Sequence, residues 1–389
     1  MTPLPMLQHD TSSEVTEGLA KLQLPPEPRN VFYNPKMSMN RDLAMLFVNS
    51  YFPSSERVQL CDPMTGSGVR AVRYLLETPN VNHVVAADRD LSAVQLAQET
   101  VLRNGLKDRV AVVQSDAYTL LSNHSTDRFD MIDLDPFGSP APFFESALRA
   151  TTDEGVIAAT ATDMGPLSGA RPRACMRKYG ISPVRAEFGK ELAIRTLASC
   201  LSTAACRMEL GLQIQFSHST DHYARLYAVA RKGRKVANQT LQNLGYLIYC
   251  PTCLLRSEAQ SISFVQGGCV NCGAPARVGG PLWFGPLWDR ETVESMVRHT
   301  PHLDSSQLSR IQRLLGLVQG EVGAPSFYYT TAAMASAYGV NPPSLNLLIE
   351  SLRECGNQAA GTHFSSTGFR TDASLQTIVA CFRKIAQKS

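Results

Sequence analysis

Apolar runs and amphipathic stretches alternate regularly between residues 57 and 163. Five short runs rich in Val, Ile, Leu and Ala end at a polar residue or a turn, as buried strands do. The expected strands are residues 57–62, 83–88, 109–116, 129–135 and 155–163. Between them, residues 67–78 and 91–104 place apolar side chains at helical spacing. Strands that alternate with helices predict a parallel sheet covered by helices on both faces.

The pattern continues beyond residue 163 with longer elements. A loop rich in Gly, Pro and Arg is expected over residues 165–183, followed by a long helix over 184–210. Two further strands, 212–217 and 224–231, lie close enough in sequence to pair as a hairpin. The seven strands together predict an α/β domain over residues 31–236, with a mostly parallel seven-stranded sheet. Residues 1–30 are expected to form a flexible N-terminal segment.

The character of the sequence changes at about residue 237. Two Cys-x-x-Cys pairs and a loop that holds both tryptophans, residues 279–288, precede helical patterns at 291–299 and 307–316. Two helices, a polar loop and a final helix are then expected at 331–337, 343–354, 361–372 and after residue 372. These elements predict a smaller α+β C-terminal domain over residues 237–389 with a winged-helix-like end.

The composition is that of an ordinary soluble globular protein. The 389 residues are 44% hydrophobic and 18% charged, and no run of 18 apolar residues predicts a membrane span. Residues 1–10 lack the charged and apolar segments of a secretory signal. The net charge of +3 allows nucleic-acid binding without arguing for it. Basic clusters at residues 171–178 and 231–235 are candidates for a local basic face, with an ordinary solvated surface as the alternative.

Four of the ten cysteines form a pattern that is typical of a metal site. Cys250 and Cys253 are separated from Cys269 and Cys272 by 15 residues. Two such pairs predict a zinc ribbon at about residues 246–280, with four thiolates around a structural Zn²⁺. The alternative is two disulfides, which the scattered cysteines disfavour because secreted disulfide frameworks are shorter and denser. The expected compartment is the cytoplasm, with a nucleus or an organelle as the alternatives.

A glycine-rich turn follows the first strand, at residues 61–68. Glycines there let the backbone turn tightly and approach a ligand. A dinucleotide fingerprint would have a third glycine where Ala71 stands, and Asp62 inside the turn would repel a phosphate. A carboxylate can instead bind an ammonium group. Both features favour S-adenosylmethionine, which carries an amino-acid moiety and no phosphate.

Acidic residues also end the next two strands. Asp88 can accept hydrogen bonds from ribose hydroxyls, which is a common use of this position. Asp116 and Ala117 follow the third strand, where an acceptor could meet an adenine amino group. Because ligands of open α/β sheets bind at the carboxyl edge, these positions favour a cofactor site over ordinary loop residues.

The fourth strand ends in Asp135-Pro136-Phe137-Gly138, which has the form of the reaction motif of amino-group methyltransferases. An exocyclic amino nitrogen is a poor nucleophile, and a carboxylate that accepts its N–H can hold it in line with a sulfonium methyl. Pro136 stiffens the turn, and Phe137 offers a ring on which a flipped base can stack. Asp135 could either orient the amine or also take its proton. The alternative is a plain strand-end turn.

Several segments along most of the chain resemble tRNA (guanine-26, N2)-dimethyltransferases, a family of Rossmann-like class I methyltransferases. They are residues 31–37, 40–42, 62–70, 135–139, 187–189, 362–364 and 371–372. The resemblance implies transfer of one or two methyl groups from S-adenosylmethionine to guanine N2 at tRNA position 26, and in some members also at position 27. It implies tRNA as the partner, without an obligate protein partner. The cofactor residues that it implies are Arg41, Arg70, Asp88, Asp116 and Ala117, with Asp62 nearby.

Three other functions fit parts of the sequence. An amino-group methyltransferase could act on another RNA, on DNA or on protein, but the C-terminal third matches the tRNA family. A zinc-ribbon RNA-binding protein without catalysis would not need to keep its four acids, Asp62, Asp88, Asp116 and Asp135. A nicotinamide-dependent enzyme is disfavoured by the incomplete glycine fingerprint.

Overall fold

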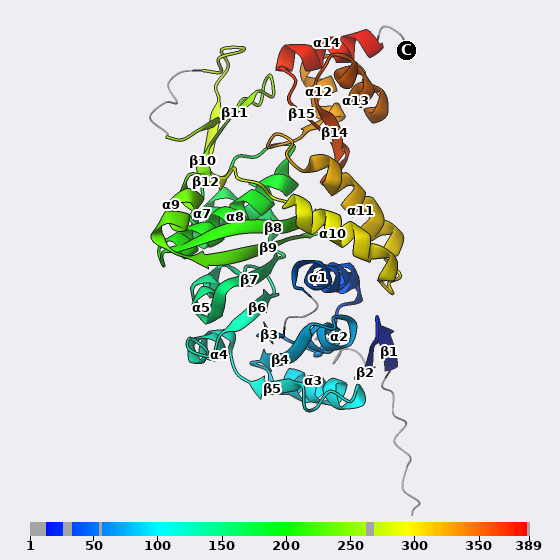
Figure 1. Ribbon diagram of the computed structural model, residues 1–389. Helices are drawn as coiled ribbons and strands as arrows, with labels where there is room; N and C mark the ends of the chain where they lie inside the picture. The colour runs from blue at the N-terminus through cyan, green and yellow to red at the C-terminus, as the bar shows by residue number, and fades with distance from the viewer. Residues whose placement is uncertain (1–12, 26–32, 54–56, 262–267, 387–389) are drawn as a thin grey trace, which may run out of the picture.

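A computed structural model of the protein describes residues 13–25, 33–53, 57–261 and 268–386. A large sheet with helices on both faces lies below a C-terminal part that contains two smaller sheets (Figure 1). Most of the expected flexible segment, residues 1–12 and 26–30, lies outside the described residues, as do Val31 and Phe32 of the family motif.

The strands of the large sheet lie in the order β5-β4-β3-β6-β7-β9-β8. They are β3 (Val58–Asp62), β4 (Val81–Asp88), β5 (Val110–Gln114), β6 (Phe129–Leu134), β7 (Thr151–Ala161), β8 (Leu210–Thr220) and β9 (Tyr223–Lys232). Neighbours from β5 to β7 are parallel, and β9 runs antiparallel to β7 and β8. The predicted mostly parallel seven-stranded sheet is confirmed. The chain reverses its order across the sheet between β3 and β6, which is where open α/β sheets bind ligands.

Helices cover both faces of this sheet (Figure 1). One face carries α1 (Ser38–Tyr51), α2 (Val69–Glu77) and α3 (Leu91–Arg103), and the other α4 (Ala117–Asn123), α5 (Phe144–Ala150) and α8 (Gly189–Cys206). The central strands are buried on both sides, so their side chains form an apolar core of Val, Ile, Leu and Ala. This explains why they read as continuous apolar runs in the sequence.

The segment between β7 and α8 differs from the prediction in two ways. The expected loop contains α6 (Met164–Leu167) and α7 (Pro172–Tyr179); α7 begins with a proline and ends at Gly180 in the left-handed conformation. The expected helix from residue 184 begins only at Gly189. Ser182 exchanges backbone hydrogen bonds with Gly280, so a long-range pairing keeps this stretch extended.

Two strands near the N-terminus correct the prediction of a flexible segment for residues 13–24. Strands β1 (Ser13–Glu17) and β2 (Ala20–Leu24) form an antiparallel hairpin that packs against α2 and α3. Ala20, Leu22 and Leu24 are buried, whereas Lys21 is exposed. This alternation is the period-2 signal of a half-buried strand.

The C-terminal part contains two three-stranded sheets and six α-helices within the described residues. Its elements are α9 (Arg234–Leu241), β10 (Leu244–Tyr249), β11 (Arg256–Ala259), β12 (Arg277–Trp283), α10 (Arg290–His299), α11 (Leu308–Glu321), β13 (Tyr329–Thr330), α12 (Thr331–Tyr338), α13 (Leu345–Glu354), β14 (Ala359–Thr362), β15 (Ser365–Thr371) and α14 (Leu375–Ala386). The helix α9 spans the predicted boundary at residue 237, and the others follow it. Residues 361–372 were expected to be a loop, but β14 and β15 form an antiparallel hairpin there. The division into two domains and the winged-helix description stay predictions.

Buried ion pairs fasten the C-terminal part to the large sheet. Glu191 of α8 binds Arg370 of β15 at 2.9 Å, and Glu187 just before α8 binds Arg256 of β11 at 2.7 Å. In addition, α10 packs against α1 (Figure 1). Among the helices that the structure describes, none is long and apolar enough to cross a membrane.

Candidate active site

The turn between β3 and α2 is shaped by its glycines and closed by a carboxylate. Gly68 has φ of +76°, and a Cβ atom there would lie 3.0 Å from the backbone of Ala97. Only glycine therefore lets α2 pack this closely against α3. The Gly66 amide donates to Asp88 at 3.1 Å, so the turn is tied to the end of β4.

The three predicted cofactor acids lie along one edge of the sheet. Asp62, Asp88 and Asp116 end or follow β3, β4 and β5, which are neighbours. Asp116 is exposed and accepts a hydrogen bond from the Thr119 amide at 3.1 Å as the cap of α4, with Ala117 buried beside it. The fold thus gathers these residues as the sequence predicts, while their roles toward a cofactor stay predictions.

Asp62 is buried at the start of the turn. Its carboxylate accepts a hydrogen bond from the Thr65 hydroxyl at 2.9 Å. Burial raises the pKa of Asp62 to about 7, although the nearby Arg70 guanidinium lowers it. A positive group that approached Asp62 would favour its ionised form, which suits the ammonium group of an amino acid.

The Asp135–Gly138 loop is held from both sides. Arg70 of α2 forms an ion pair with Asp135, and Gly138 exchanges hydrogen bonds with Thr162 after β7, at 2.8 and 2.9 Å. Gly138 has φ of +94°, a conformation that favours glycine. Phe137 between these anchors is 90% exposed. A loop anchored at both ends therefore carries a carboxylate and an exposed aromatic ring two residues apart.

A fully buried ion network lies behind this loop, and sequence reasoning missed it. Asp133 of β6 accepts two hydrogen bonds from Arg225 of β9, at 2.9 and 2.8 Å, and one from Tyr74 at 2.6 Å. It also binds Arg70 at 3.1 Å. Burial alone would raise the pKa of Asp133, but the Arg225 and Arg70 guanidiniums hold it at about 2. The only sequence signal was a second acid within an apolar strand.

Arg70 connects this network to the reaction motif. Its guanidinium contacts Asp133 and Asp135, and it donates to the Asn40 side chain of α1 at 2.9 Å. Asn40 was noted only as part of a family motif. The partners that converge on Arg70 therefore come from α1, from β6 and from the reaction motif, and α1 lies far from the other two in the sequence.

Arg41 lies in a different environment from the one predicted for a cofactor ligand. Its guanidinium binds both carboxylate oxygens of Glu17 at 2.5 Å and the Asn34 carbonyl at 3.0 Å. Glu17 also binds Arg73 at 2.9 Å. The structure thus brings Arg70 to the motif, whereas it pairs Arg41 with the N-terminal hairpin. Its role toward a cofactor carboxylate stays a prediction.

The four predicted cysteines form a compact cluster. The Sγ atoms of Cys250, Cys253, Cys269 and Cys272 lie within 4.8 Å of one another. The closest sulfur pairs are 3.6 and 3.5 Å apart, far longer than the ~2.05 Å of a disulfide. A tetrahedron with metal–sulfur bonds of ~2.3 Å has sulfur atoms about 3.8 Å apart. The cluster therefore fits a four-coordinate metal, and the disulfide alternative does not fit.

A family model of N2,N2-dimethylguanosine tRNA methyltransferases matches residues 12–383, which is nearly the whole chain. The chain belongs to this family. The resemblance seen in the sequence is confirmed, and with it the class of enzyme, a tRNA methyltransferase. The non-catalytic and nicotinamide-dependent alternatives do not agree with this membership.

Individual family members resemble the chain over nearly their full length. The tRNA (guanine(26)-N(2))-dimethyltransferase of Methanosphaerula palustris is 35% identical over 376 residues, which are 94% of this chain and 98% of the relative. The tRNA (guanine(26)-N(2)/guanine(27)-N(2))-dimethyltransferase of Aquifex aeolicus is 32% identical, with 94% of each chain covered. The structure of Trm1 from Pyrococcus horikoshii with S-adenosyl-L-methionine matches 95% of this chain and 99% of its own, with 31% identity and a TM-score of 0.86.

Proposed function

We propose that this protein transfers methyl groups from S-adenosylmethionine to N2 of guanine 26 in tRNA. The observation that carries this is the match to the Trm1 structure with S-adenosyl-L-methionine, at a TM-score of 0.86 over 95% of the chain. The structure supports it locally, because Asp135 and Phe137 follow the fourth parallel strand at the switch point of the sheet.

The proposed role of Asp135 is to hold the amino group of the target guanine. Its carboxylate accepts an N–H of the amine, which directs the nitrogen lone pair at the methyl group. The bound cofactor supplies this methyl group on a sulfonium. A nitrogen–carbon bond forms as the sulfur–carbon bond breaks, and the amine proton leaves to Asp135 or to water. Phe137 stacks on the base, and Arg70 fixes the carboxylate of Asp135.

The cofactor is proposed to lie across the ends of β3, β4 and β5. Asp88 would accept hydrogen bonds from the ribose hydroxyls, and Asp116 with Ala117 would contact the adenine. Asp62 would meet the methionine ammonium group, since its buried carboxyl accepts a positive neighbour readily. Arg70 and Arg41 would serve the methionine carboxylate, although acidic partners already occupy both in the structure.

A transfer assay tests the proposed function directly. The protein is mixed with labelled S-adenosylmethionine and unmodified tRNA transcripts that carry guanine or adenine at position 26. We expect label only on the guanine transcript, because adenine lacks the N2 amino group. No transfer, or equal transfer to both transcripts, would contradict the proposal. A transcript with adenine at position 26 and guanine at position 27 tests for the second activity in the name of the Aquifex aeolicus relative.

The metal of the four-cysteine cluster is proposed to be Zn²⁺ with a structural role. All four ligands are thiolates, which leave no open position for a substrate. The Asn271 amide lies 3.4 Å from the sulfur of Cys269, as backbone donors do in such turns. The cluster joins the ends of β10 and β12, so the metal would hold this small sheet together.

We expect elemental analysis to find about one zinc per chain, and a Cys253→Ser/Cys269→Ser variant to lose it. This variant should unfold at a lower temperature, because metal binding contributes to folding free energy. The matched control is Cys206→Ser, whose half-buried thiol lies outside the cluster and should leave the zinc content unchanged. Full zinc content in the double variant would contradict the assignment.

A further inference from the structure

A large hollow begins beside the reaction motif and leads away from it. Its volume is about 920 Å³, and Ser139 and Tyr118 line the end next to the motif and the α4 cap. Its walls come from α4, α5, α7 and α8. Arg177 on α7, Arg149 on α5 and Arg207 after α8 line it and are exposed. The hollow is therefore basic and open to solvent.

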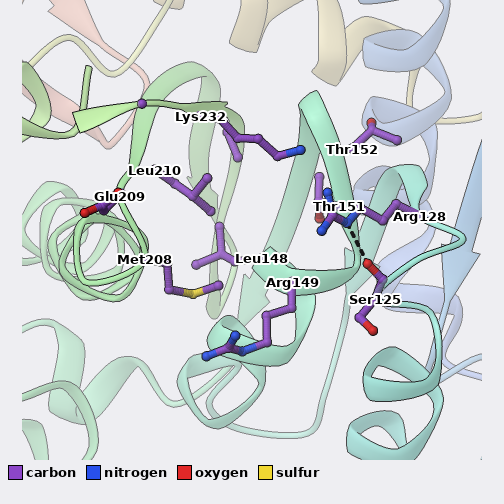
Figure 2. Close-up of a pocket in the computed structure, with 12 residues that line it drawn as sticks. Ser125, Arg128, Leu148, Arg149, Thr151, Thr152, Met208, Glu209, Leu210 and Lys232 are labelled. Carbon is purple, nitrogen blue, oxygen red and sulfur yellow. Dashed lines mark hydrogen bonds between the residues drawn. The ribbon is translucent and has the colours of Figure 1, made fainter. Parts of the chain in front are cut away.

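A second hollow of about 380 Å³ lies at the amino ends of β6 and β7, the ends of these strands that are far from the reaction motif. Arg149 lines both hollows. Arg128 before β6 and Lys232 at the end of β9 reach toward each other on either side of Thr151 (Figure 2). We call the two hollows, with their basic residues Arg128, Arg149, Arg177, Arg207 and Lys232, the basic track.

The acidic side chains that line the basic track are fewer, and some are already paired. Glu209 binds Arg234 at 2.8 Å and lies apart from Lys232 and Arg128 (Figure 2). Glu145 faces Arg207 at 3.9 Å, with both side chains more than half exposed. Within the described residues, no acidic group forms an ion pair with Arg128, Arg149, Arg177 or Lys232. For a chain of net charge only +3, this is a local excess of positive charge.

We propose that the basic track binds the phosphate backbone of the tRNA on one side of the target nucleotide. This inference rests on the proposed function. Strand β7 separates the two ends of the basic track with 11 residues, or roughly 36 Å at 3.3 Å per residue. A tract of this length can contact several successive phosphates of an RNA strand. Exposed arginine and lysine side chains contact phosphates without reading sequence, so the basic track positions the RNA while Phe137 and Asp135 receive the base.

The test neutralises the end of the basic track that lies far from the motif. The variant is Arg128→Gln/Arg149→Gln/Lys232→Gln. Its matched control, Lys21→Gln/Arg103→Gln/Lys107→Gln, removes three exposed positive charges on β2, at the end of α3 and after α3, near the edge strand β5. Binding of an unmodified tRNA transcript is measured by fluorescence anisotropy from about 50 to about 300 mM salt, so that the dependence of Kd on salt concentration can be determined. Methyl transfer and binding of S-adenosylmethionine are measured in parallel.

In the basic-track variant we expect Kd and KM for tRNA to rise at least about tenfold. We also expect the slope of log Kd against log salt concentration, called the salt slope, to fall by about 2–3, one for each lost phosphate contact. Its kcat at saturating tRNA and its affinity for S-adenosylmethionine should match the control, which shows that the fold is intact. The single Arg149→Gln variant should show a smaller change of the same kind. If the variant and the control had the same KM for tRNA and the same salt slope, the proposal that the basic track binds tRNA would be overturned. Absence of label transfer by the wild-type protein would show separately that the proposed function fails, and the inference with it.

Discussion

Replacing Asp135 by alanine is expected to lower kcat for methyl transfer to tRNA by about 10²–10⁴-fold, the usual range for a lost acid–base or orienting group. The variant would no longer accept the amine N–H. Its guanine nitrogen would lose the interaction that aligns it with the methyl group. Cofactor affinity should remain, because Arg70 keeps Asp133 and Asn40 as partners without Asp135. Single-turnover kinetics and calorimetry with S-adenosylmethionine measure the two effects.

Asp135→Asn separates the two proposed roles of this carboxylate. The amide oxygen still accepts a hydrogen bond but is far less basic. If Asp135 only orients the amine, the Asn variant should retain much more activity than the Ala variant. If Asp135 takes the proton, both should be similarly slow. The control is Asp108→Ala, which removes an exposed acid between α3 and β5. Lost cofactor affinity in Asp135→Ala would place Asp135 in the cofactor site instead.

The sequence predicted well those features that depend on local periodicity. Buried parallel strands are continuous apolar runs, so β3, β4 and β6 were located within one or two residues of their observed bounds. Their carboxyl ends must meet at one edge, so the positions of Asp62, Asp88 and Asp135 along that edge followed from topology. The spacing of the cysteines likewise predicted a cluster, because each Cys-x-x-Cys pair forms one turn.

Features that depend on long-range partners could not be predicted. Asp133 and Arg225 are 92 residues apart, and neither lies in a recognisable motif. The family resemblance implied Arg41 as a cofactor residue, and its ion pair with Glu17 could not be foreseen because Glu17 was assigned to a flexible segment. Residues 184–188 have helix-compatible side chains, but Ser182 pairs with Gly280 and keeps the chain extended. In each case tertiary contacts override the local signal.

The partners of Asp133 explain how a buried charge network can serve the reaction motif. Arg225 is completely buried and reaches Asp133 from β9, while Tyr227 accepts a hydrogen bond from Arg225 at 2.8 Å. Arg70 is thereby held between Asp133 and Asp135 with little freedom. Such a preorganised arrangement fixes the direction of the Asp135 carboxylate before substrate binds.

Replacing Asp133 by alanine is therefore expected to destabilise the whole protein by about 3–5 kcal/mol, because it leaves buried arginines without their shared counterion. Urea unfolding should show a lower midpoint, and Asp108→Ala should stay within about 0.5 kcal/mol of the wild type. The pKa of Asp133 is about 2 in the folded protein, below the ordinary aspartate value of 3.8 that applies to the unfolded chain. Its stabilising effect is thus complete above a pH of about 4 and is lost as the pH falls toward 2.

The double variant Asp133→Leu/Arg225→Met tests whether the loss comes from uncompensated charge. Apolar side chains of similar size remove the unpaired Arg225 as well as the carboxylate, so we expect the double variant to unfold at a higher urea concentration than Asp133→Ala. Arg70 would still bind Asp135 and Asn40, but without its anchor it should orient Asp135 less well. We therefore expect recovered stability together with a reduced kcat. If Asp133→Ala unfolded at the wild-type midpoint, the network would not stabilise the fold. If the double variant also kept the wild-type kcat, the network would not position Asp135.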